Sequence, residues 1–129
     1  MAQSACILIF NAKNQLLIQV RSRNDDSYPS HWDFSAAGGV ETGETPDQAA
    51  KRELKEELGV ELDVNYKTTV SFEGEQLEIY TSKCDEINFH PNYEVEEVFF
   101  LNLEEIKERH KAGQKLHPEF IHILKKLFF

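Results

Sequence analysis

The sequence predicts an α/β fold in which helices cover the faces of one β-sheet. Two observations lead to this expectation. Apolar strand-like runs alternate with about three segments of helical periodicity, and no linker, repeat or low-complexity stretch separates them. The 129 residues are enough for one hydrophobic core, and a hydrophobic content of 40% is ordinary for a globular protein. We therefore expect a single domain over residues 1–129.

The first third of the chain supplies the strands that precede the first helix. Residues 5–10 (ACILIF) and 15–21 (QLLIQVR) are apolar runs joined by the turn-rich segment NAKN, which predicts a β-hairpin. A polar loop follows, and residues 32–40 then lead to the pair Gly38 and Gly39. A glycine-rich approach to a helix can present N–H groups or carbonyls to a phosphate or a metal.

The first predicted helix covers residues 45–58. Thr45 is a good N-cap, Pro46 is tolerated at the first helical position, and Gly59 is the usual residue just past a helix end. Its apolar stripe is Ala50, Leu54 and Leu58.

The remaining elements follow in the second half of the chain. Residues 66–72 and 76–84 flank the short segment EGE and predict a second hairpin. Residues 94–102 predict a strand that is polar at first and apolar at its end. Residues 102–113 predict a short helix, and a last helix begins at Pro118. Its apolar residues recur at helical spacing: Phe120, Ile121, Leu124, Leu127 and Phe128.

The charge balance excludes several classes of function. Lys and Arg number 14 against 23 Asp and Glu, and the net charge of −9 argues against nonspecific binding of DNA or RNA, whose phosphates need a basic surface. No apolar run approaches the ~20 residues of a membrane span, and no secretory signal pattern is present. Cys6 and Cys84 give neither a disulfide framework nor a metal-ligand spacing. We expect a cytoplasmic protein without membrane contact.

Three glutamates, Glu53, Glu56 and Glu57, crowd into the end of the first predicted helix. Like charges three or four residues apart repel by roughly 0.2–0.5 kcal/mol per pair, and the negative end of the helix dipole adds roughly 0.3–1 kcal/mol per carboxylate. Arg52 can pair with Glu56 but is expected at the flank of the cluster. Such a face is usually just solvated. We favour the alternative that these hard oxygen ligands bind Mg²⁺ or Mn²⁺, which would remove both penalties.

Residues 38–60 contain a fixed pattern around the glutamates. Its positions are Gly38, five residues, Glu44, seven residues, Arg52-Glu53-Leu54, one residue, Glu56-Glu57, one residue, and Gly59-Val60. This pattern resembles the Nudix box, the signature of the Nudix hydrolase family, and the order and spacing of the other segments resemble the whole family domain. The resemblance implies a mixed β-sheet between helices, an α/β/α sandwich, with a strand–loop–helix–loop catalytic unit.

The family's residue roles carry over to the matching positions. Glu53, Glu56 and Glu57 would bind the divalent cation, Mg²⁺ or alternatively Mn²⁺, with the carbonyl of Gly38 as a further ligand. By the same resemblance, Glu44 would tie the loop to the helix, and the arginine before Glu53 would orient that carboxylate.

The family usually takes one more carboxylate from a later strand or loop. We favour Glu97, because it immediately precedes the apolar run VFFL; the alternative is that this segment is merely an exposed strand end. The general base that takes the proton of the attacking water is expected to be Glu53, or alternatively Glu97. The acidic candidates in the segment YEVEEV are Glu94, Glu96 and Glu97.

Residues 28–39 (YPSHWDFSAAGG) resemble the isopentenyl-diphosphate isomerase-like branch of the family, in which a Trp-Asp-x-Ser run leads into the box. Isomerases of that type place a catalytic Cys just before the glycine that is Gly38 here, and a metal-binding His just after it. This sequence has Ala37 and Gly39 at those positions, and neither can donate a proton or bind a metal. Isomerase activity is therefore not expected.

The resemblance implies an Mg²⁺-dependent hydrolase acting on a small-molecule diphosphate. The cleaved bond would be the diphosphate linkage of a nucleoside diphosphate joined to another moiety, or of a related organic pyrophosphate. Arg21 is the candidate phosphate-binding residue, with a surface salt bridge as its alternative. The competing function is a noncatalytic module that binds a nucleotide or a protein. The sequence leaves open the substrate, the number of metal ions and the oligomeric state.

Overall fold

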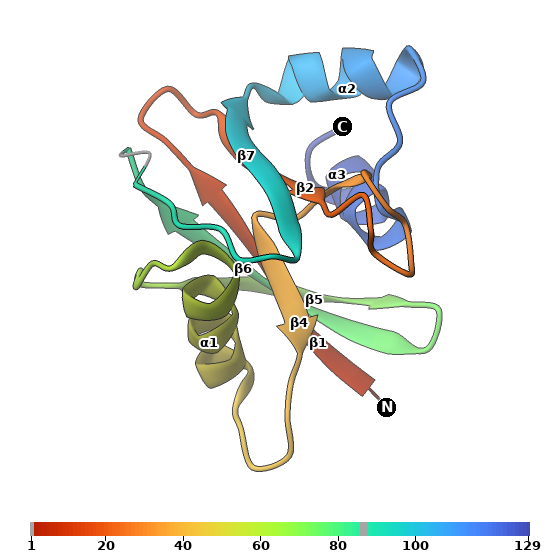
Figure 1. Cartoon of the computed structure of the whole chain (residues 1–129). Helices are drawn as coiled ribbons and strands as arrows, with labels where there is room; N and C mark the ends of the chain where they lie inside the picture. The colour runs from red at the N-terminus through yellow and green to blue at the C-terminus, as the bar shows by residue number, and fades with distance from the viewer. Residues whose placement is uncertain (1, 86–87) are drawn as a thin grey trace.

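A mixed β-sheet lies between helices in the computed structural model, which describes residues 2–85 and 88–129 (Figure 1). This arrangement confirms the predicted α/β sandwich. The described strands are β1 (Ala2–Phe10), β2 (Leu16–Arg21), β3 (Trp32–Asp33), β4 (Ala36–Gly39), β5 (Asn65–Phe72), β6 (Glu75–Lys83) and β7 (Val95–Leu101), and the described helices are α1 (Pro46–Leu58), α2 (Leu103–Lys111) and α3 (Pro118–Leu127).

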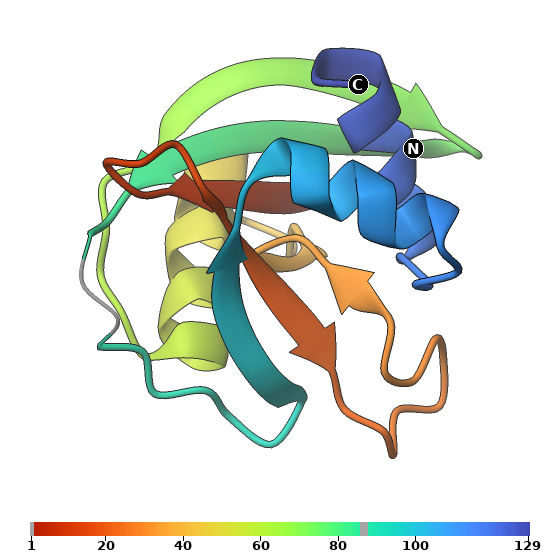
Figure 2. The ribbon, with the colours of Figure 1, turned by 90° about the horizontal axis from the view of Figure 1, so that it is seen from above.

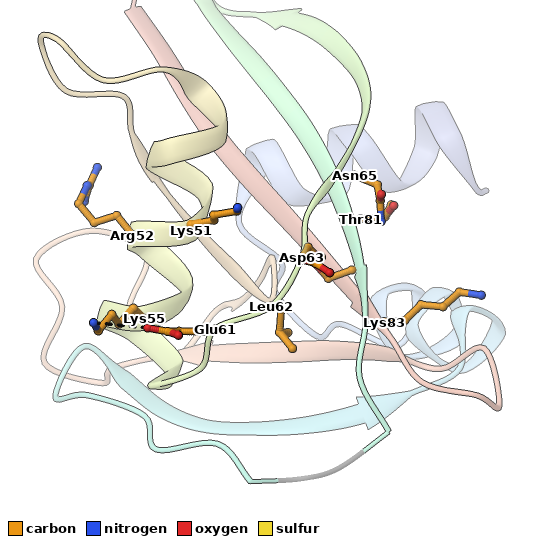
Figure 3. Close-up of a pocket in the computed structure, with 10 residues that line it drawn as sticks. Lys51, Arg52, Lys55, Glu61, Leu62, Asp63, Asn65, Thr81 and Lys83 are labelled. Atoms are coloured by element: carbon orange, nitrogen blue, oxygen red, sulfur yellow. Dashed lines mark hydrogen bonds and ion pairs between the residues drawn. The ribbon is translucent and has the colours of Figure 1, made fainter.

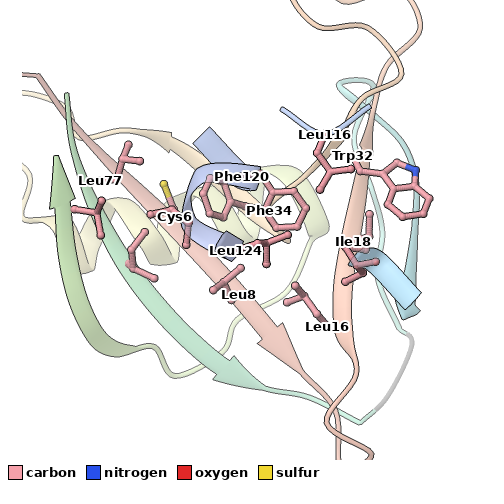
Figure 4. Close-up of a cluster of buried hydrophobic side chains, with 14 of the residues drawn as sticks. Cys6, Leu8, Leu16, Ile18, Trp32, Phe34, Leu77, Leu116, Phe120 and Leu124 are labelled. Atoms are coloured by element: carbon pink, nitrogen blue, oxygen red, sulfur yellow. The ribbon is translucent and has the colours of Figure 1, made fainter. Parts of the chain in front are cut away.

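The alternation of side chains along β1 creates a hydrophobic core on each face of the sheet. Cys6 and Leu8 point to one face, where residues of α2 and α3 such as Phe120 pack against them (Figure 4). Ile7 and Ile9 point to the other face. There they join the predicted stripe of α1, whose residues Ala50, Leu54 and Leu58 are all fully buried. The helices therefore lie on opposite faces of the sheet, as Figure 2 also shows.

The predicted first hairpin is confirmed only at its turn, where Phe10 pairs with Leu16. Beyond that pair β1 and β2 separate. β4 runs antiparallel to β1, with Cys6 opposite Ala37, and β6 pairs with β1 in parallel on its other side. β2 instead pairs with β3 and β7, both antiparallel. Non-local pairing has overridden the local hairpin signal.

The segment over residues 32–40, which leads to Gly38 and Gly39, contains two short strands, β3 and β4, separated by Phe34 and Ser35. The Ser35 hydroxyl accepts a bond from the N–H of Ile9 at 2.9 Å and donates to the carbonyl of Leu17 at 2.7 Å. A side chain thus satisfies one main-chain group on each of β1 and β2 where these strands have parted, as buried backbone groups require.

Helix α1 begins and ends where the sequence predicts. Thr45 and Gln48 form a reciprocal capping box, and Gly59 ends the helix with a positive φ of 68°. The carbonyl of Leu58 accepts the N–H of His90 at 2.8 Å, and the carbonyl of Glu57 accepts the N–H of Asn92 at 3.1 Å. A segment distant in sequence therefore covers the end of the helix that carries the glutamates.

The second hairpin, the last strand and the last two helices are confirmed within a few residues of their predicted bounds. The two residues between β5 and β6, Glu73 and Gly74, both have positive φ, as type I′ turns require. Asn102 is the N-cap of α2, and His117 is the N-cap of α3. None of the described helices has the length and apolar character needed to span a membrane.

A substitution at the end of α1 tests how firmly the segment with His90 and Asn92 is held against the helix. In Gly59→Ala the new Cβ would lie 3.0 Å from the Cβ of His90 and 3.2 Å from its carbonyl oxygen. The alanine would also have to adopt the left-handed conformation of Gly59, which has φ +68°. Gly43→Ala is the matched control, because Gly43 has φ +83° and open space around its Cβ position. The control should lower the free energy of unfolding by about 1–2 kcal/mol, and Gly59→Ala should lower it further. Urea unfolding measures both. Equal losses would show that the segment moves aside freely.

Candidate active site

The three glutamates of α1 lie beside its packed face and differ in exposure. Glu53 and Glu57 are buried, with 8% and 7% of their surface exposed, whereas Glu56 is exposed. Helical spacing places Glu53 next to both of the others. Two carboxylates therefore share a poorly solvated position, where an uncompensated charge is costly.

Arg52 lies inside this acidic cluster rather than at its flank, which corrects the placement expected from the sequence. Its Nε and Nη2 atoms bond both oxygens of Glu44 at 2.8 and 3.0 Å. Its Nη1 atom lies 2.7 Å from Glu53 Oε1 and 3.3 Å from Glu56 Oε2. Nη2 also donates to the carbonyl of Gly39 at 2.9 Å. One guanidinium thus offsets part of the repulsion between the glutamates.

Glu44 links the loop before α1 to the helix through these bonds. Besides its paired contact with Arg52, its Oε1 atom accepts the N–H of Glu41 at 3.0 Å. Hydrogen bonds from Arg52 lower the pKa of Glu44 to about 2. The carboxylate therefore stays ionised at neutral pH and keeps the loop and helix together.

Glu57 is held from the opposite side by the sheet. Gln19 Nε2 on β2 donates to Glu57 Oε1 at 2.8 Å, and the N–H of Ala37 on β4 donates to the same oxygen at 3.3 Å. Burial, together with neighbouring Glu53, raises the pKa of Glu57 to about 9. Gln19 was not among the expected site residues, although a polar residue within the apolar run LLIQVR was a signal for it.

Gly38 is in close contact with the carboxylate of Glu53. A Cβ atom added to Gly38 would lie 2.1 Å from Glu53 Oε1, whereas one added to Gly39 would have nothing within 4 Å. The glycine is required here by the close approach of a side chain. Any larger residue at position 38 must displace the Glu53 carboxylate.

The donor set of this region fits a hard divalent cation. In residues 2–85 and 88–129, no three His, Cys, Asp or Glu side chains already converge as a metal cluster. The three α1 glutamates and the Gly38 carbonyl are nevertheless the oxygen ligands that Mg²⁺ prefers. Burial raises the pKa of Glu57, and a bound cation would favour its ionised form. Glu53, Glu56, Glu57 and Gly38 could therefore hold the ion.

A cavity of about 190 Å³ opens beside Gly38 and Glu57. Arg21, the candidate phosphate ligand, also lines it. Arg21 already forms ion pairs with Asp33 at 2.9 Å and Asp25 at 3.1 Å, so the salt-bridge alternative describes its present contacts. Its guanidinium remains at the cavity wall, where a bound anion could compete for it.

The start of α3 forms another part of this cavity wall. Burial lowers the pKa of His117, and burial together with neighbouring Glu75 raises the pKa of Glu119 to about 8. Neither His117 nor Glu119 was among the site residues expected from the sequence. No local pattern could have indicated them, because only the fold brings α3 to a cavity formed by residues about 80 positions earlier.

The structure does not bring Glu97 to the glutamate cluster. Glu97 pairs with Val20, whose side chain belongs to the core beneath α2 and α3, so the pairing places Glu97 on the sheet face opposite α1. Glu96 pairs with exposed Arg23 at 3.4 Å. Of the three acidic residues in this segment, Glu94 is the one that lines the cavity with Glu57.

Comparison with known proteins agrees with this architecture. A Nudix hydrolase of Listeria innocua, named as uncharacterised, is 52% identical over 59 residues, which are 46% of this chain and 35% of that protein. The chain therefore spans about a third of the length of this curated relative. An isopentenyl-diphosphate Delta-isomerase of Escherichia coli is 39% identical over 54 residues, 42% of this chain and 30% of that protein, consistent with the resemblance to that branch.

A solved structure shares the fold over almost the whole chain. The crystal structure of DR0079 from Deinococcus radiodurans superimposes with a TM-score of 0.90, covering 99% of this chain and 83% of that one at 23% identity. A family model of the NUDIX domain matches residues 2–122. The chain therefore belongs to the NUDIX domain family.

Proposed function

We propose that the chain is a divalent-cation-dependent hydrolase that cleaves a diphosphate linkage. The substrate is a nucleoside diphosphate joined to another moiety, or a related organic pyrophosphate. The observation that carries this proposal is a pair of buried carboxylates: Glu53 lies against Gly38, and Glu57 lines a cavity together with Gly38 and Arg21. Membership of a family with relatives named as hydrolases supports it.

The chain's own residues would hold and orient the reacting groups. When bound, Mg²⁺ or Mn²⁺ would neutralise charge on the diphosphate oxygens and help to lower the pKa of the attacking water. Gln19 and the N–H of Ala37 fix one oxygen of Glu57, which leaves its second oxygen for the cation. Arg52 fixes one oxygen of Glu53 in the same way. Both carboxylates would therefore be oriented before the cation binds.

Glu53 is the general base in this proposal. It is buried, lies against Gly38 and is oriented by Arg52. The oxygen that Arg52 does not bond would both contact the cation and take the proton of a water next to it. Glu97, the alternative base and proposed fifth ligand, would first have to reach α1 from the other face of the sheet. Glu94 at the cavity wall is the better placed source of a later carboxylate.

Arg21 would contribute to substrate binding rather than to chemistry. Its ion pair with Asp33 is poorly exposed, with side-chain exposures of 20% and 8%. A diphosphate at the cavity would have to compete with Asp25 and Asp33 for the guanidinium. Because Asp25 is the more exposed partner, it is the contact that such a ligand would displace.

The proposal is tested by coupling each reaction to a phosphomonoesterase and measuring phosphate release, because cleavage of a substituted nucleoside diphosphate itself yields two monophosphate esters and no inorganic phosphate. Nucleoside diphosphate derivatives and isoprenoid diphosphates form the panel, assayed with Mg²⁺, with Mn²⁺ and with a chelator. Metal-dependent turnover of at least one diphosphate ester is expected. Tight, metal-dependent binding without turnover across the panel would favour the noncatalytic module instead.

Glu53→Gln should lower kcat by about 10²–10⁴-fold with little change in KM, because a positioned general base contributes about that much. Glu97→Gln is the matched control, and its kcat should stay close to that of the wild type, because the Glu97 side chain lies on the opposite sheet face. Arg21→Ala should act mainly on KM. Steady-state kinetics with excess metal separates these cases. A larger loss of kcat in Glu97→Gln than in Glu53→Gln would assign the base to β7.

Metal should stabilise the folded protein through the α1 glutamates. At a metal concentration a hundred times Kd, a ligand selective for the folded state adds about 2.7 kcal/mol, or roughly 10 °C in Tm for a domain of this size. Glu56→Gln combined with Glu57→Gln should abolish this gain and leave the apo protein at least as stable. The first change removes a charge that repels Glu53, and an amide oxygen at position 57 can still accept the bonds from Gln19 and Ala37. Thermal unfolding followed by circular dichroism measures both. An unchanged response to metal in the double variant would place the ion elsewhere.

The two adjacent glycines should differ sharply in their tolerance of alanine. Gly38→Ala should displace the Glu53 carboxylate and lower both metal affinity and kcat by about 10²-fold or more while the protein still folds. Gly39→Ala adds the same methyl group one residue later, in open space, and should change neither quantity by more than about twofold. Calorimetric titration with Mn²⁺ and steady-state kinetics are the measurements. Equal metal affinities and equal kcat values in the two variants would contradict the contact between Gly38 and Glu53.

A further inference from the structure

The cavity of about 190 Å³ beside Glu57 opens where the strands β1 and β2 have separated. Its walls include Gln19 of β2 and Ala37 of β4, which lie on the two sides of this gap. Because the gap passes through the sheet, Glu57 of α1 and Glu119 of α3 both line the cavity, although their helices cover opposite faces. The cavity therefore has a wall that contains none of the proposed metal ligands.

Two glutamates from distant parts of the chain meet at this wall, and we call them the Glu75/Glu119 pair. Glu119 is the second residue of α3. Glu75 begins β6, and alternation along the strand puts it on the same face as Leu77, which packs in the core beneath α2 and α3. The two carboxyl groups approach from the sheet and the helix to within hydrogen-bond reach.

No cation compensates the charge of this pair within residues 2–85 and 88–129, where none of the ion pairs includes either member. Arg21 is the arginine at the cavity wall, but Asp25 and Asp33 bond it directly. His117 is the N-cap of α3, and burial lowers its pKa, so the ring is neutral at pH 7. The pair therefore has to be stabilised in another way.

The other titratable groups around the pair are neutral or acidic. Cys6 on β1 is fully buried, and burial raises the pKa of its thiol well above the usual value, so it carries no charge. Asp33 faces the same region from β3. Further carboxyl groups line the cavity, namely those of Asp25, Glu57 and Glu94. A diphosphate that enters the cavity would meet one arginine and an excess of carboxyl groups.

Two carboxyl groups in contact without a cation share a proton, because ionising both in a partly buried place is costly. Burial and the neighbouring Glu75 raise the pKa of Glu119 to about 8, although the start of a helix by itself favours the ionised form. At pH 7 the pair therefore carries one negative charge instead of two.

We propose that the Glu75/Glu119 pair determines how strongly the cavity binds the diphosphate, because its shared proton removes one negative charge from the wall. The identity of the ligand rests on the proposed hydrolysis. When the proton is lost, the added charge repels the phosphate oxygens. Substrate affinity should therefore fall as the pH rises through about 8. The bond-breaking step should not follow this titration, because the pair lies on α3 and β6 and contributes no group to the proposed metal site.

A larger hollow, of about 880 Å³, lies between α1 and the strand pair β5 and β6, but it does not collect basic groups around an anion (Figure 3). Lys51 lines it from α1. Lys83 of β6 pairs with Phe10, which packs on the core beneath α2 and α3, so Lys83 points to the sheet face opposite α1. Arg52 is bonded to Glu44. The smaller cavity is therefore the better placed site for an anionic substrate.

The first test measures KM and kcat from pH 6.5 to pH 9 with saturating Mg²⁺. The substrate is whichever diphosphate of the panel is cleaved and has both phosphates esterified, because its own charge is constant over this range. Product is measured directly by chromatography. In the wild type, KM should rise by about three- to tenfold, since one unit charge beside a partly solvated cavity has an effect of that order.

Glu119→Gln holds the pair at one negative charge at every pH, because the amide can donate to Glu75 and cannot ionise. Its KM should change by less than about twofold over the same range, while the pH profile of kcat keeps the wild-type shape. Glu75→Gln combined with Glu119→Gln removes the remaining charge and should give a lower KM than Glu119→Gln. The matched control is Glu108→Gln, which removes an exposed charge from α2 and should keep the wild-type rise in KM.

A second measurement needs no turnover. In metal-free protein with ¹³C-labelled glutamate carboxyl groups, the signal that Glu119→Gln removes should titrate near pH 8 in the wild type. P,P′-dimethyl methylenediphosphonate, an uncleavable diphosphate analogue of constant charge, is then titrated calorimetrically with Mg²⁺ present. Between pH 6.5 and pH 9 its affinity should fall by about three- to tenfold for the wild type and by less than about twofold for Glu119→Gln.

Parallel KM profiles in the wild type and Glu119→Gln would overturn the role of the pair and leave the proposed hydrolysis standing. A Glu119 signal that titrates below about pH 6, or no binding of the analogue at pH 6.5, would also overturn the inference. The absence of turnover across the whole panel would overturn the proposed hydrolysis alone, because the carboxyl titration and the binding of the analogue still decide whether the pair controls anion affinity.

Discussion

The proposed site depends on one constraint: several carboxylates must be held close together before a cation is bound. Arg52 meets this constraint by bonding Glu44, Glu53 and the Gly39 carbonyl with one guanidinium. Its planar group bonds both oxygens of Glu44 and still reaches Glu53, Glu56 and Gly39, which is more than the three N–H donors of a lysine could do. The loop after β4 and the helix α1 are thereby fixed to each other. The carboxylate of Glu53 then has one available position, and that position requires glycine at residue 38.

The separation of β1 and β2 gives the sheet its part in the site. If these strands had paired along their length, β4 could not lie beside β1, and Gly38 would not face α1. Ser35 makes the separation tolerable by bonding one main-chain group of each strand. Gln19 on β2 then reaches Glu57 across the sheet face. A departure from the simplest hairpin is therefore what allows sheet, loop and helix to meet around two buried carboxylates.

Helix α1 presents opposite charges to two sides of the molecule. Glu57 borders the cavity beside Gly38, and Lys51 and Lys55 border a larger hollow next to β5 and β6. The buried stripe of Leu54 and Leu58 fixes the rotation of the helix about its axis, so both faces are set by the same packing. The acidic face fits a cation followed by a diphosphate.

The sequence by itself determined the features that depend on residues a few positions apart. Helix α1, its ends at Thr45 and Gly59 and the spacing of its glutamates follow from capping and helical periodicity, which act over three or four residues. Only the tertiary structure decided which later residues reach the site. The face that Glu97 occupies depends on the register between β7 and β2, where a shift of one residue reverses every side chain. His117 and Glu119 arrive at the cavity because α3 packs on the far core, a long-range contact that leaves no periodic signal in the chain.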